Sequence, residues 1–361
     1  MRAAAQRLTK DTAAASRRPA AILRQVVGLQ AQVLSAAALG MRVRSTGLRA
    51  SDVNRALVDE RSIVRTWLMR GTLHLVAADD IRWLVQLLGP VIARAGATRH
   101  AQLGLDDDLK TRGVAALRRI LADAGPMTRY ELLDHLRLRG ILLEPRTQAT
   151  IHLIGLAAMQ AVLCVGPDRD DGASTYVLFD DWVAPARTPT REAALAELAR
   201  RYFAAYGPAT VDDLGAWSGI ATAEARSAVA GAKPSLADVT IQGQPGFVLN
   251  DRLRQVTAPA PAQARMLPAF DTYLLGYRRR DLAVAPALQQ RLHRGGGWLH
   301  PAVVVNGCAV AAWSLRKSGG AGRLQLEPFA GISRAIRAGI EAEVADIGRF
   351  LDLPVTLEIA R

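Results

Sequence analysis

The segment Ile63-Val64-Arg65-Thr66-Trp67-Leu68-Met69-Arg70-Gly71-Thr72-Leu73-His74-Leu75-Val76 gives the clearest indication of the fold. Residues 63–69 and 72–76 are rich in β-branched and apolar side chains, which predicts two neighbouring strands. Arg70-Gly71 between them suits a two-residue hairpin turn. The segment is therefore expected to form a β-hairpin, and the flanking elements indicate what it belongs to.

Helical patterns surround this hairpin. Three helix candidates precede it, at residues 20–27, 36–43 and 50–59. Gly28 is expected to end the first in the left-handed conformation, and Ser35 and Ser51 are expected to cap the second and third. A further helix is expected at residues 79–96. Three helices followed by a hairpin are the winged-helix arrangement.

The same order of elements recurs twice. Helix candidates at 109–124, 128–139 and 146–161 precede strands at 161–165 and 175–179. Candidates at 190–206, 210–217 and 222–230 precede strands at 239–241 and 246–249. We therefore expect an α+β, mainly helical protein with three tandem winged helices, at residues 1–105, 106–186 and 187–255.

The tail, residues 256–361, follows a different pattern. Val303-Val304-Val305-Asn306-Gly307-Cys308-Ala309-Val310 predicts a hairpin, because Asn-Gly favours the positive φ angles of a type I′ turn. A third strand is expected at 323–327, a helix from Ser333 to about residue 351, and a last strand at 354–359. This C-terminal β-hairpin and α/β segment is expected to pack on the helical core.

Charge points to a polyanionic partner. The chain has 361 residues, half of them hydrophobic, and a formal net charge of +13. Such an excess favours nucleic acid or an anionic membrane surface. Lysine occurs only at Lys10, Lys110, Lys233 and Lys317, so nearly all basic charge is arginine, and a GC-rich genome would also produce that composition.

Cysteine usage and hydropathy indicate the compartment. Cys164 and Cys308 are too few for a disulfide framework or a thiolate metal cage, which fits a reducing cytoplasm. No segment approaches the roughly 18 consecutive apolar residues of a membrane span, and residues 1–18 lack the apolar core of a secretory signal. We expect a cytoplasmic protein with no membrane association.

Gln30-Ala31-Gln32 is the candidate for chemistry. Residues two apart point about 200° apart around a helix but to the same side of an extended segment, so the two amides converge only if the segment is non-helical. Its place between two helix candidates, shortly after Gly28, favours that conformation. An isolated Gln-x-Gln is also compatible with an ordinary polar turn.

Other catalytic or ligand-binding motifs are missing from the sequence. The six histidines show no zinc-ligand spacing, so no metal site is expected. There is no phosphate-binding Gly-x-x-x-x-Gly-Lys loop, no Gly-x-Gly-x-x-Gly after a strand and no Gly-x-Ser-x-Gly.

Basic and aromatic residues gather instead in two regions. In the tail they are Arg278, Arg280, Arg294, Trp298 and His300, the last three around a run of three glycines; on the first hairpin they are Arg65, Arg70 and His74. A glycine-rich loop with arginines and an indole suits close approach to a phosphate backbone. The alternative is a surface loop whose arginines reflect codon bias.

With these residues assembled, the chain resembles the winged-helix DNA glycosylase family of AlkZ and YcaQ-type proteins. The resemblance spans nearly the whole chain in order. It is carried by Gly28-Leu29-Gln30-Ala31-Gln32, by Thr66-Trp67-Leu68-Met69-Arg70-Gly71-Thr72-Leu73-His74, by Leu267-Pro268-Ala269-Phe270-Asp271-Thr272-Tyr273-Leu274-Leu275-Gly276-Tyr277-Arg278, and by residues 298–307. The family's catalytic motif is glutamine, an apolar residue and glutamine in its antibiotic-resistance branch, with aspartate second in the YcaQ-type branch. Gln32 therefore resembles the resistance branch.

The resemblance implies tandem winged helices arranged in a C shape around a central DNA-binding cavity, with Gln30 and Gln32 as catalytic residues. It implies a base-excision-repair enzyme, without cofactor, that hydrolyses the N-glycosidic bond of alkylated purines in double-stranded DNA. Bulky N7-alkylguanine adducts and interstrand crosslinks are the substrates of the resistance branch. We expect a monofunctional enzyme, because none of the four lysines lies in a recognisable Schiff-base site, and a monomer. The alternative is a non-catalytic winged-helix DNA-binding protein or transcriptional regulator.

Overall fold

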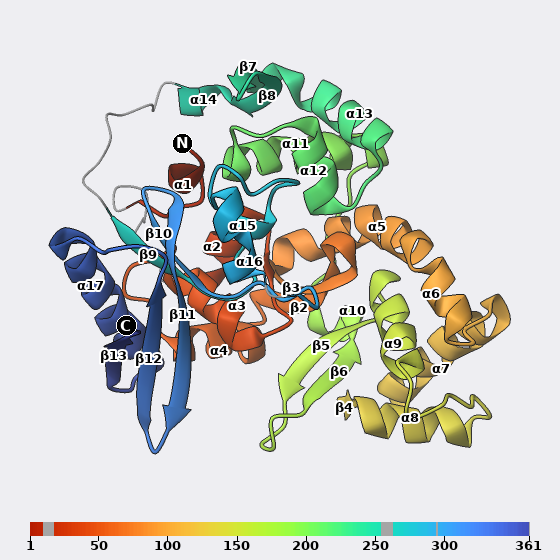
Figure 1. The fold of residues 1–361 in the computed structure, drawn as a ribbon. Coiled ribbons are helices and arrows are strands. Elements are labelled where there is room, and N and C mark those ends of the chain that lie inside the picture. The colour runs from red at the N-terminus through yellow and green to blue at the C-terminus, as the bar shows by residue number, and fades with distance from the viewer. Residues whose placement is uncertain (10–17, 254–262, 294, 361) are drawn as a thin grey trace.

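The computed structural model describes residues 1–9, 18–253, 263–293 and 295–360 (Figure 1). Arg294 and the boundary expected at residues 255–256 lie outside the described residues. Among the described residues, no helix is both long and apolar enough to cross a membrane.

The first block contains the expected helices and hairpin. Its elements, in order, are α1 (Arg2–Ala5), α2 (Pro19–Val26), β1 (Leu29–Gln30), α3 (Leu34–Arg42), α4 (Ala50–Val58), β2 (Ile63–Leu68), β3 (Thr72–Ala77), α5 (Ala78–Ala95) and α6 (Ala97–Gln102). Leu68 pairs with Thr72 across the hairpin. The loop is therefore three residues, Met69–Gly71, and not the predicted two, because the Met69 side chain is buried while Arg70 and Gly71 take positive φ angles.

The helix caps of this block differ from those predicted. α2 ends with Val27 in the left-handed conformation, followed by Gly28 at a φ of 107°. α3 begins at Leu34 after an extended Val33, so Ser35 lies inside the helix. α4 begins at Ala50 because the Arg49 backbone N–H donates to the Asp52 carboxylate, so Ser51 is not its cap.

The second block continues the sheet of the first. Its elements are α7 (Asp107–Ala124), β4 (Met127–Thr128), α8 (Arg129–Leu138), α9 (Ala149–Met159), β5 (Leu163–Asp168), β6 (Ser174–Leu178) and α10 (Phe179–Trp182). Arg65 of β2 pairs with Val165 of β5, which unites the two hairpins in one six-stranded sheet of order β1-β3-β2-β5-β6-β4. The helix predicted at 146–161 is shorter, since α9 starts only at Ala149.

The third block is a helical trio with a separate two-stranded sheet. It contains α11 (Arg191–Tyr206), α12 (Val211–Ser218), α13 (Thr222–Ala232), β7 (Leu236–Ile241), β8 (Gln244–Leu249) and α14 (Asn250–Leu253). The buried face of α11 includes Leu198, Tyr202 and Tyr206, and these side chains share one core with α5 and with Val64, Leu68 and Val76 of the first hairpin. This core therefore joins the third block to one face of the six-stranded sheet.

The tail forms its own sheet. It contains β9 (Ala264–Leu267), α15 (Thr272–Leu275), α16 (Gln289–Leu292), β10 (Ala302–Val305), β11 (Cys308–Ser318), β12 (Ala321–Pro328), α17 (Arg334–Leu351) and β13 (Val355–Ile359), with strand order β13-β12-β11-β10-β9. Asn306 and Gly307 both have positive φ, 51° and 85°, which confirms the predicted hairpin turn. Ser333 caps α17, also as predicted.

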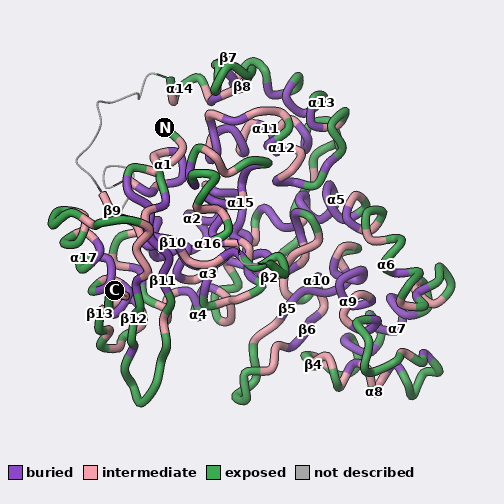
Figure 2. The backbone as a smooth tube through the Cα atoms, viewed as in Figure 1, coloured by how far each residue is buried: buried purple, intermediate pink, exposed green. Residues whose placement is uncertain are grey.

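A second core joins the tail to the first block. Ile340, Val344 and Ile347 of α17 pack in one cluster with Leu29, Ala31 and Leu39 and with Met266 and Trp313 of the tail sheet. Figure 2 shows the buried residues concentrated around α2, β10 and α15, while the ends of the β5–β6 and β11–β12 hairpins are exposed. The segment with the two glutamines thus lies where the first block and the tail meet.

Candidate active site

The two glutamines converge as the sequence predicted. Gln30 ends the short strand β1, and Gln32 lies between β1 and α3. The Gln30 Nε2 donates to the Gln32 Oε1 at 3.2 Å. Gln32 is exposed and Gln30 half-buried, whereas Ala31 between them is fully buried. The side chains alternate, so both amides reach the surface while the apolar residue anchors the segment in the core.

Local packing explains why Gly28 precedes the pair. Leu29 pairs with Leu75 and Gln30 with His74, which lays β1 against β3. A Cβ atom on Gly28 would lie 3.0 Å from both the Leu75 carbonyl and the Val76 side chain, at a φ that disfavours other residues. The glycine therefore permits the close approach that holds the amides at the edge of the six-stranded sheet.

A buried polar row lies behind Gln30. Gln30 pairs with His74, and His74 with Thr66, so the three side chains share one face of the sheet. His74 is only 4% exposed, and its Nδ1 donates to the Thr72 carbonyl at 2.9 Å. Burial lowers the pKa of His74 to about 4, with the charge of Arg70 contributing and the Thr72 hydrogen bond opposing. A buried neutral imidazole offers phosphate no cation, and DNA contact by His74 stays a prediction.

Arg65 and Arg70 lie on either side of this row in the hairpin. The half-buried Arg65 donates to the Ala31 carbonyl at 3.1 Å and to the Gln32 carbonyl at 3.4 Å. Arg70 has an exposed side chain, and its Nη1 donates to the Trp217 carbonyl at 2.6 Å. Desolvation lowers the pKa of the Arg70 guanidinium, and the charge of Arg280 lowers it further against the opposing effect of two tyrosines. Arg70 and Arg280 therefore lie within electrostatic reach of each other.

The remaining predicted DNA contacts lie in the tail and differ from one another in exposure. Arg278 is exposed and pairs with Asp212 of α12. Arg280 is half-buried and donates from Nε to the Leu274 carbonyl at 2.9 Å. Trp298 is 44% exposed and lies edge-to-face on Phe270, with ring centroids 4.7 Å apart.

The loop that carries Trp298 is built from glycines. Gly295, Gly296 and Gly297 all have positive φ, and nothing lies within 4 Å of where their Cβ atoms would be. His300 at the end of the loop is half-buried, and its backbone N–H donates to the Leu292 carbonyl. The loop thus presents an indole at the surface, and DNA contact by these residues stays a prediction.

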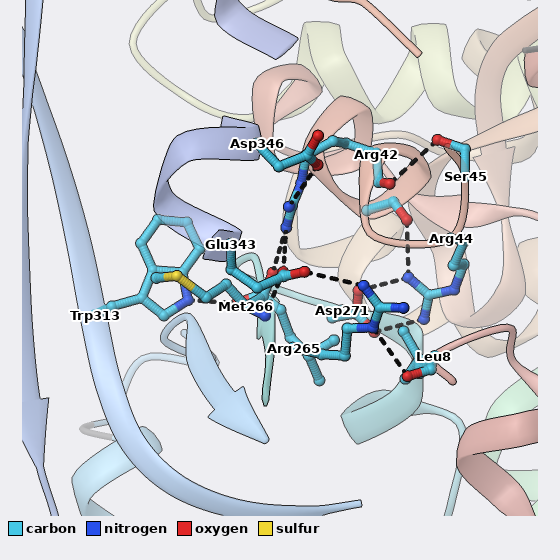
Figure 3. A network of polar contacts seen from close by, with 12 residues as sticks. Leu8, Arg42, Arg44, Ser45, Arg265, Met266, Asp271, Trp313, Glu343 and Asp346 are labelled. Carbon is cyan, nitrogen blue, oxygen red and sulfur yellow. Dashed lines mark hydrogen bonds and ion pairs between the residues drawn. The ribbon is translucent and has the colours of Figure 1, made fainter. Parts of the chain in front are cut away.

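Asp271, in the stretch Leu267 to Arg278 that carries part of the resemblance, belongs to a buried polar network (Figure 3). The Asp271 carboxylate pairs with Arg44, which follows α3, at 2.7 Å, and both side chains are fully buried. Arg42 at the end of α3 pairs with Glu343 and Asp346 of α17, each at 3.0 Å. These ion pairs therefore join the tail to α3, the helix that follows the two glutamines.

Sequence reasoning missed these joining residues. Arg42 ends an apolar helix and Arg44 follows it, and in the sequence both resemble any other surface arginine of this arginine-rich chain. Their partners are more than 220 positions away. The usable signal in the sequence is the stretch Leu267 to Arg278 around Asp271, which carries part of the family resemblance.

Together these features describe an α+β protein with two paired amides at its surface, on a segment whose backbone Arg65 contacts, as expected for a DNA glycosylase of the kind that the sequence resembles. A family profile described as DNA glycosylase AlkZ-like matches residues 23–350. The chain therefore belongs to the AlkZ-like family and is a DNA glycosylase.

Comparisons of sequence and of structure both find similarity to DNA glycosylases of Streptomyces sahachiroi. In sequence, a protein of this organism named interstrand DNA cross-link repair glycosylase is 29% identical over 348 residues, which cover 91% of this chain and 89% of that protein. The solved structure of the DNA glycosylase AlkZ from this organism superposes with a TM-score of 0.83 at 25% identity, over 99% of this chain and 98% of that one. Membership of a glycosylase family speaks against the alternative of a non-catalytic regulator.

Proposed function

We propose that the protein is a monofunctional DNA glycosylase that excises alkylated purines, chiefly bulky N7-alkylguanine adducts, and unhooks interstrand crosslinks. The observation that carries this proposal is the contact between the Gln30 and Gln32 amides, 3.2 Å apart at the protein surface. We assign the catalytic role to these two residues. The crosslink-repair name of the relative supports the choice of substrate.

The chemistry of the lesion matches a pair of amides. Alkylation at N7 or N3 makes the purine a cationic leaving group, so cleavage of its C1′–N bond needs little general acid. The site must then stabilise an oxocarbenium-like sugar and orient a water molecule. A glutamine carbonyl offers partial negative charge and a hydrogen-bond acceptor without the cost of desolvating a carboxylate. Because an amide is a weak base, the enzyme is restricted to glycosidic bonds that are already weakened.

A monofunctional mechanism is consistent with the lysine positions. A bifunctional glycosylase needs an amine that forms a Schiff base with the sugar. Lys110 and Lys233 form ion pairs with Asp107 and Asp238, and Lys317 is exposed on β11. Lys10 lies outside the described residues. The product is therefore an abasic site with an intact backbone.

We interpret the three helical trios with their hairpins as winged helices, at residues 1–105, 106–186 and 187–255, followed by the tail at 256–361. In this interpretation they surround a DNA-binding cavity in a C shape, and the protein acts as a cytoplasmic monomer on double-stranded DNA. Arg70, Arg278, Arg280, Arg294, Trp298 and His300 are the proposed DNA contacts.

Excision from a defined duplex tests this function. A duplex with one N7-alkylguanine is incubated with protein and then treated with alkali, which cleaves at abasic sites. We expect alkali-dependent scission at the lesion and none without alkali. Scission equal to the protein-free control contradicts a glycosylase of these lesions, and scission without alkali contradicts the monofunctional assignment. A crosslinked duplex separates unhooking from excision of monoadducts.

Single substitutions test the catalytic assignment. Gln30→Ala and Gln32→Ala are each expected to lower single-turnover excision by about 10²- to 10³-fold, as for the loss of an electrostatic catalytic group, with little change in DNA affinity. Gln102→Ala, an exposed glutamine on α6, is the matched control. Wild-type rates in both catalytic variants would place the active site elsewhere.

A further inference from the structure

We propose that Arg65 is a positioning residue that fixes the Gln30-Ala31-Gln32 segment from behind, and is not a DNA contact. The inference rests on the proposed function for its catalytic meaning, but its structural basis is independent. It follows from the groups that the guanidinium contacts.

The segment has two backbone carbonyls that regular structure does not pair. β1 ends at Gln30 and α3 begins at Leu34, so the carbonyls of Ala31 and Gln32 lie outside both elements. The Ala31 N–H donates to the Leu73 carbonyl at 2.6 Å, but this bond gives the Ala31 carbonyl no partner. A polar backbone group near the core needs a partner, because leaving it unpaired costs the energy of a lost hydrogen bond.

Arg65 supplies a partner to each of the two carbonyls, and its third nitrogen binds Ser174. Nε donates to the Ala31 carbonyl at 3.1 Å, Nη2 to the Gln32 carbonyl at 3.4 Å and Nη1 to the Ser174 hydroxyl at 3.4 Å. Arg65 is on β2 opposite Leu75, so it projects from the sheet face that also carries Leu29. The planar guanidinium suits this task, since its donors point in fixed directions while a lysine ammonium acts as a point charge.

Fixing the backbone fixes the amides. Gln32 is exposed, so few contacts of its own side chain restrain it. Its orientation towards Gln30 then depends on the peptide from which it extends, and Arg65 binds the carbonyls on both sides of the Gln32 N–H. Ser174 at the start of β6 ties the guanidinium, in turn, to the second hairpin. Burial lowers the pKa of Arg65 and the charge of nearby Asp168 opposes this, as expected for a cation enclosed by protein.

The test compares Arg65→Lys with Ser174→Ala and with Arg112→Lys, an exposed arginine on α7 that pairs with Asp108. Three properties are measured: the single-turnover excision rate at saturating DNA, the dissociation constant across salt concentrations, and hydrogen exchange in peptides covering residues 28–34. We expect Arg65→Lys to slow excision by about 10²-fold, the scale of a small misplacement of catalytic groups. Exchange in residues 28–34 should rise, and the melting temperature should fall slightly because hydrogen bonds of the guanidinium are lost.

Each outcome is decisive. Ser174→Ala should lower the rate less than Arg65→Lys, and Arg112→Lys should match the wild type. Unchanged exchange in residues 28–34 overturns the positioning role whatever the rate. Lysine keeps the positive charge, so the salt dependence is measured on Arg65→Gln: a flatter slope together with a normal rate at saturating DNA identifies Arg65 as a phosphate contact instead. If exchange rises but Gln32→Ala is fully active, Arg65 still positions the segment, and only the catalytic assignment of the glutamines fails.

Discussion

At the scale of single residues, His74 is a site candidate whose side chain is buried in the sheet beside Gln30. Its ring lies between Gln30 and Thr66 in the sheet, and a carbonyl accepts from its Nδ1. Since a carbonyl only accepts, Nδ1 carries a proton, and because burial lowers the pKa of His74 to about 4, the ring is neutral at pH 7 with an unprotonated Nε2. His74 thus supports the sheet directly behind the proposed catalytic pair without bringing a charge there.

The buried neutral state of His74 predicts a pH dependence of stability. Its pKa of about 4 in the folded protein lies below the ordinary value of 6.5, so the unfolded chain binds the proton more readily. The free energy of unfolding should therefore fall as the pH falls from about 6.5 to about 4, by about 3 kcal/mol from this group. Urea unfolding at pH 7 and pH 4 measures the loss.

His74→Gln provides the control, because glutamine keeps a polar side chain and does not titrate. Its stability should fall less than that of the wild type over the same pH range, although it starts lower at pH 7. Carboxylates also titrate in this window and affect both proteins equally. Equal losses in the two proteins would show that His74 does not remain neutral.

At the scale of elements, local signals predicted more than tertiary ones. The Asn306-Gly307 turn, the Ser333 cap of α17 and the hairpin at residues 63–76 were predictable because residue type and spacing act within a few positions. The caps at Ser35 and Ser51 were wrong because contacts elsewhere decide where those helices begin. The convergence of Gln30 and Gln32 followed from strand geometry. The union of two hairpins in one sheet through Arg65 and Val165 did not, since their pairing spans 100 residues.

The Asn306-Gly307 turn makes a testable contribution to stability. Gly307 has a φ of 85°, and a Cβ atom there would lie 2.7 Å from the Tyr273 hydroxyl, which donates to the Gly307 carbonyl at 2.9 Å. Gly307→Ala should destabilise the protein by about 2–3 kcal/mol, from the unfavourable φ and the displaced tyrosine. Denaturant unfolding measures the change.

Gly320 in the β11–β12 turn is the matched control. Its φ is 76°, and nothing lies within 4 Å of its missing Cβ. Gly320→Ala should therefore cost only the backbone strain, about 1 kcal/mol. Equal losses at the two positions would mean that contact with Tyr273 has no part in holding the tail hairpin.

At the scale of the whole molecule, buried ion pairs join the tail to the segment with the glutamines. The Arg44–Asp271 pair is fully buried, and the Gly40 carbonyl accepts from the same guanidinium at 2.9 Å. Removing the charge from one partner leaves the other buried and unpaired, which typically costs about 3–5 kcal/mol. Asp271→Asn should lower the free energy of unfolding by that amount, as measured by urea denaturation.

Asp352→Asn is the control for this substitution. Asp352 pairs with Arg49 at 3.4 Å, and its side chain is 90% exposed. Losing an exposed pair of this kind should change stability by less than about 1 kcal/mol. If Asp271→Asn were equally mild, the tail would be held by its apolar core alone, and the ion pairs would not be needed to place α3.

The positive surface charge of the tail should contribute to DNA affinity. Arg278 and Arg280 are the arginines proposed as phosphate contacts in the described part of the tail, and each contact should contribute a slope of about −0.9 to the plot of log K against log salt. Arg278→Gln and Arg280→Gln should each flatten that slope, whereas Arg337→Gln on α17, paired with Glu341, should leave it unchanged. Asp212→Asn removes the carboxylate that pairs with Arg278, so it should raise affinity. Fluorescence anisotropy with an undamaged duplex measures all four variants, and a slope that none of them alters would remove this face of the tail from the DNA interface.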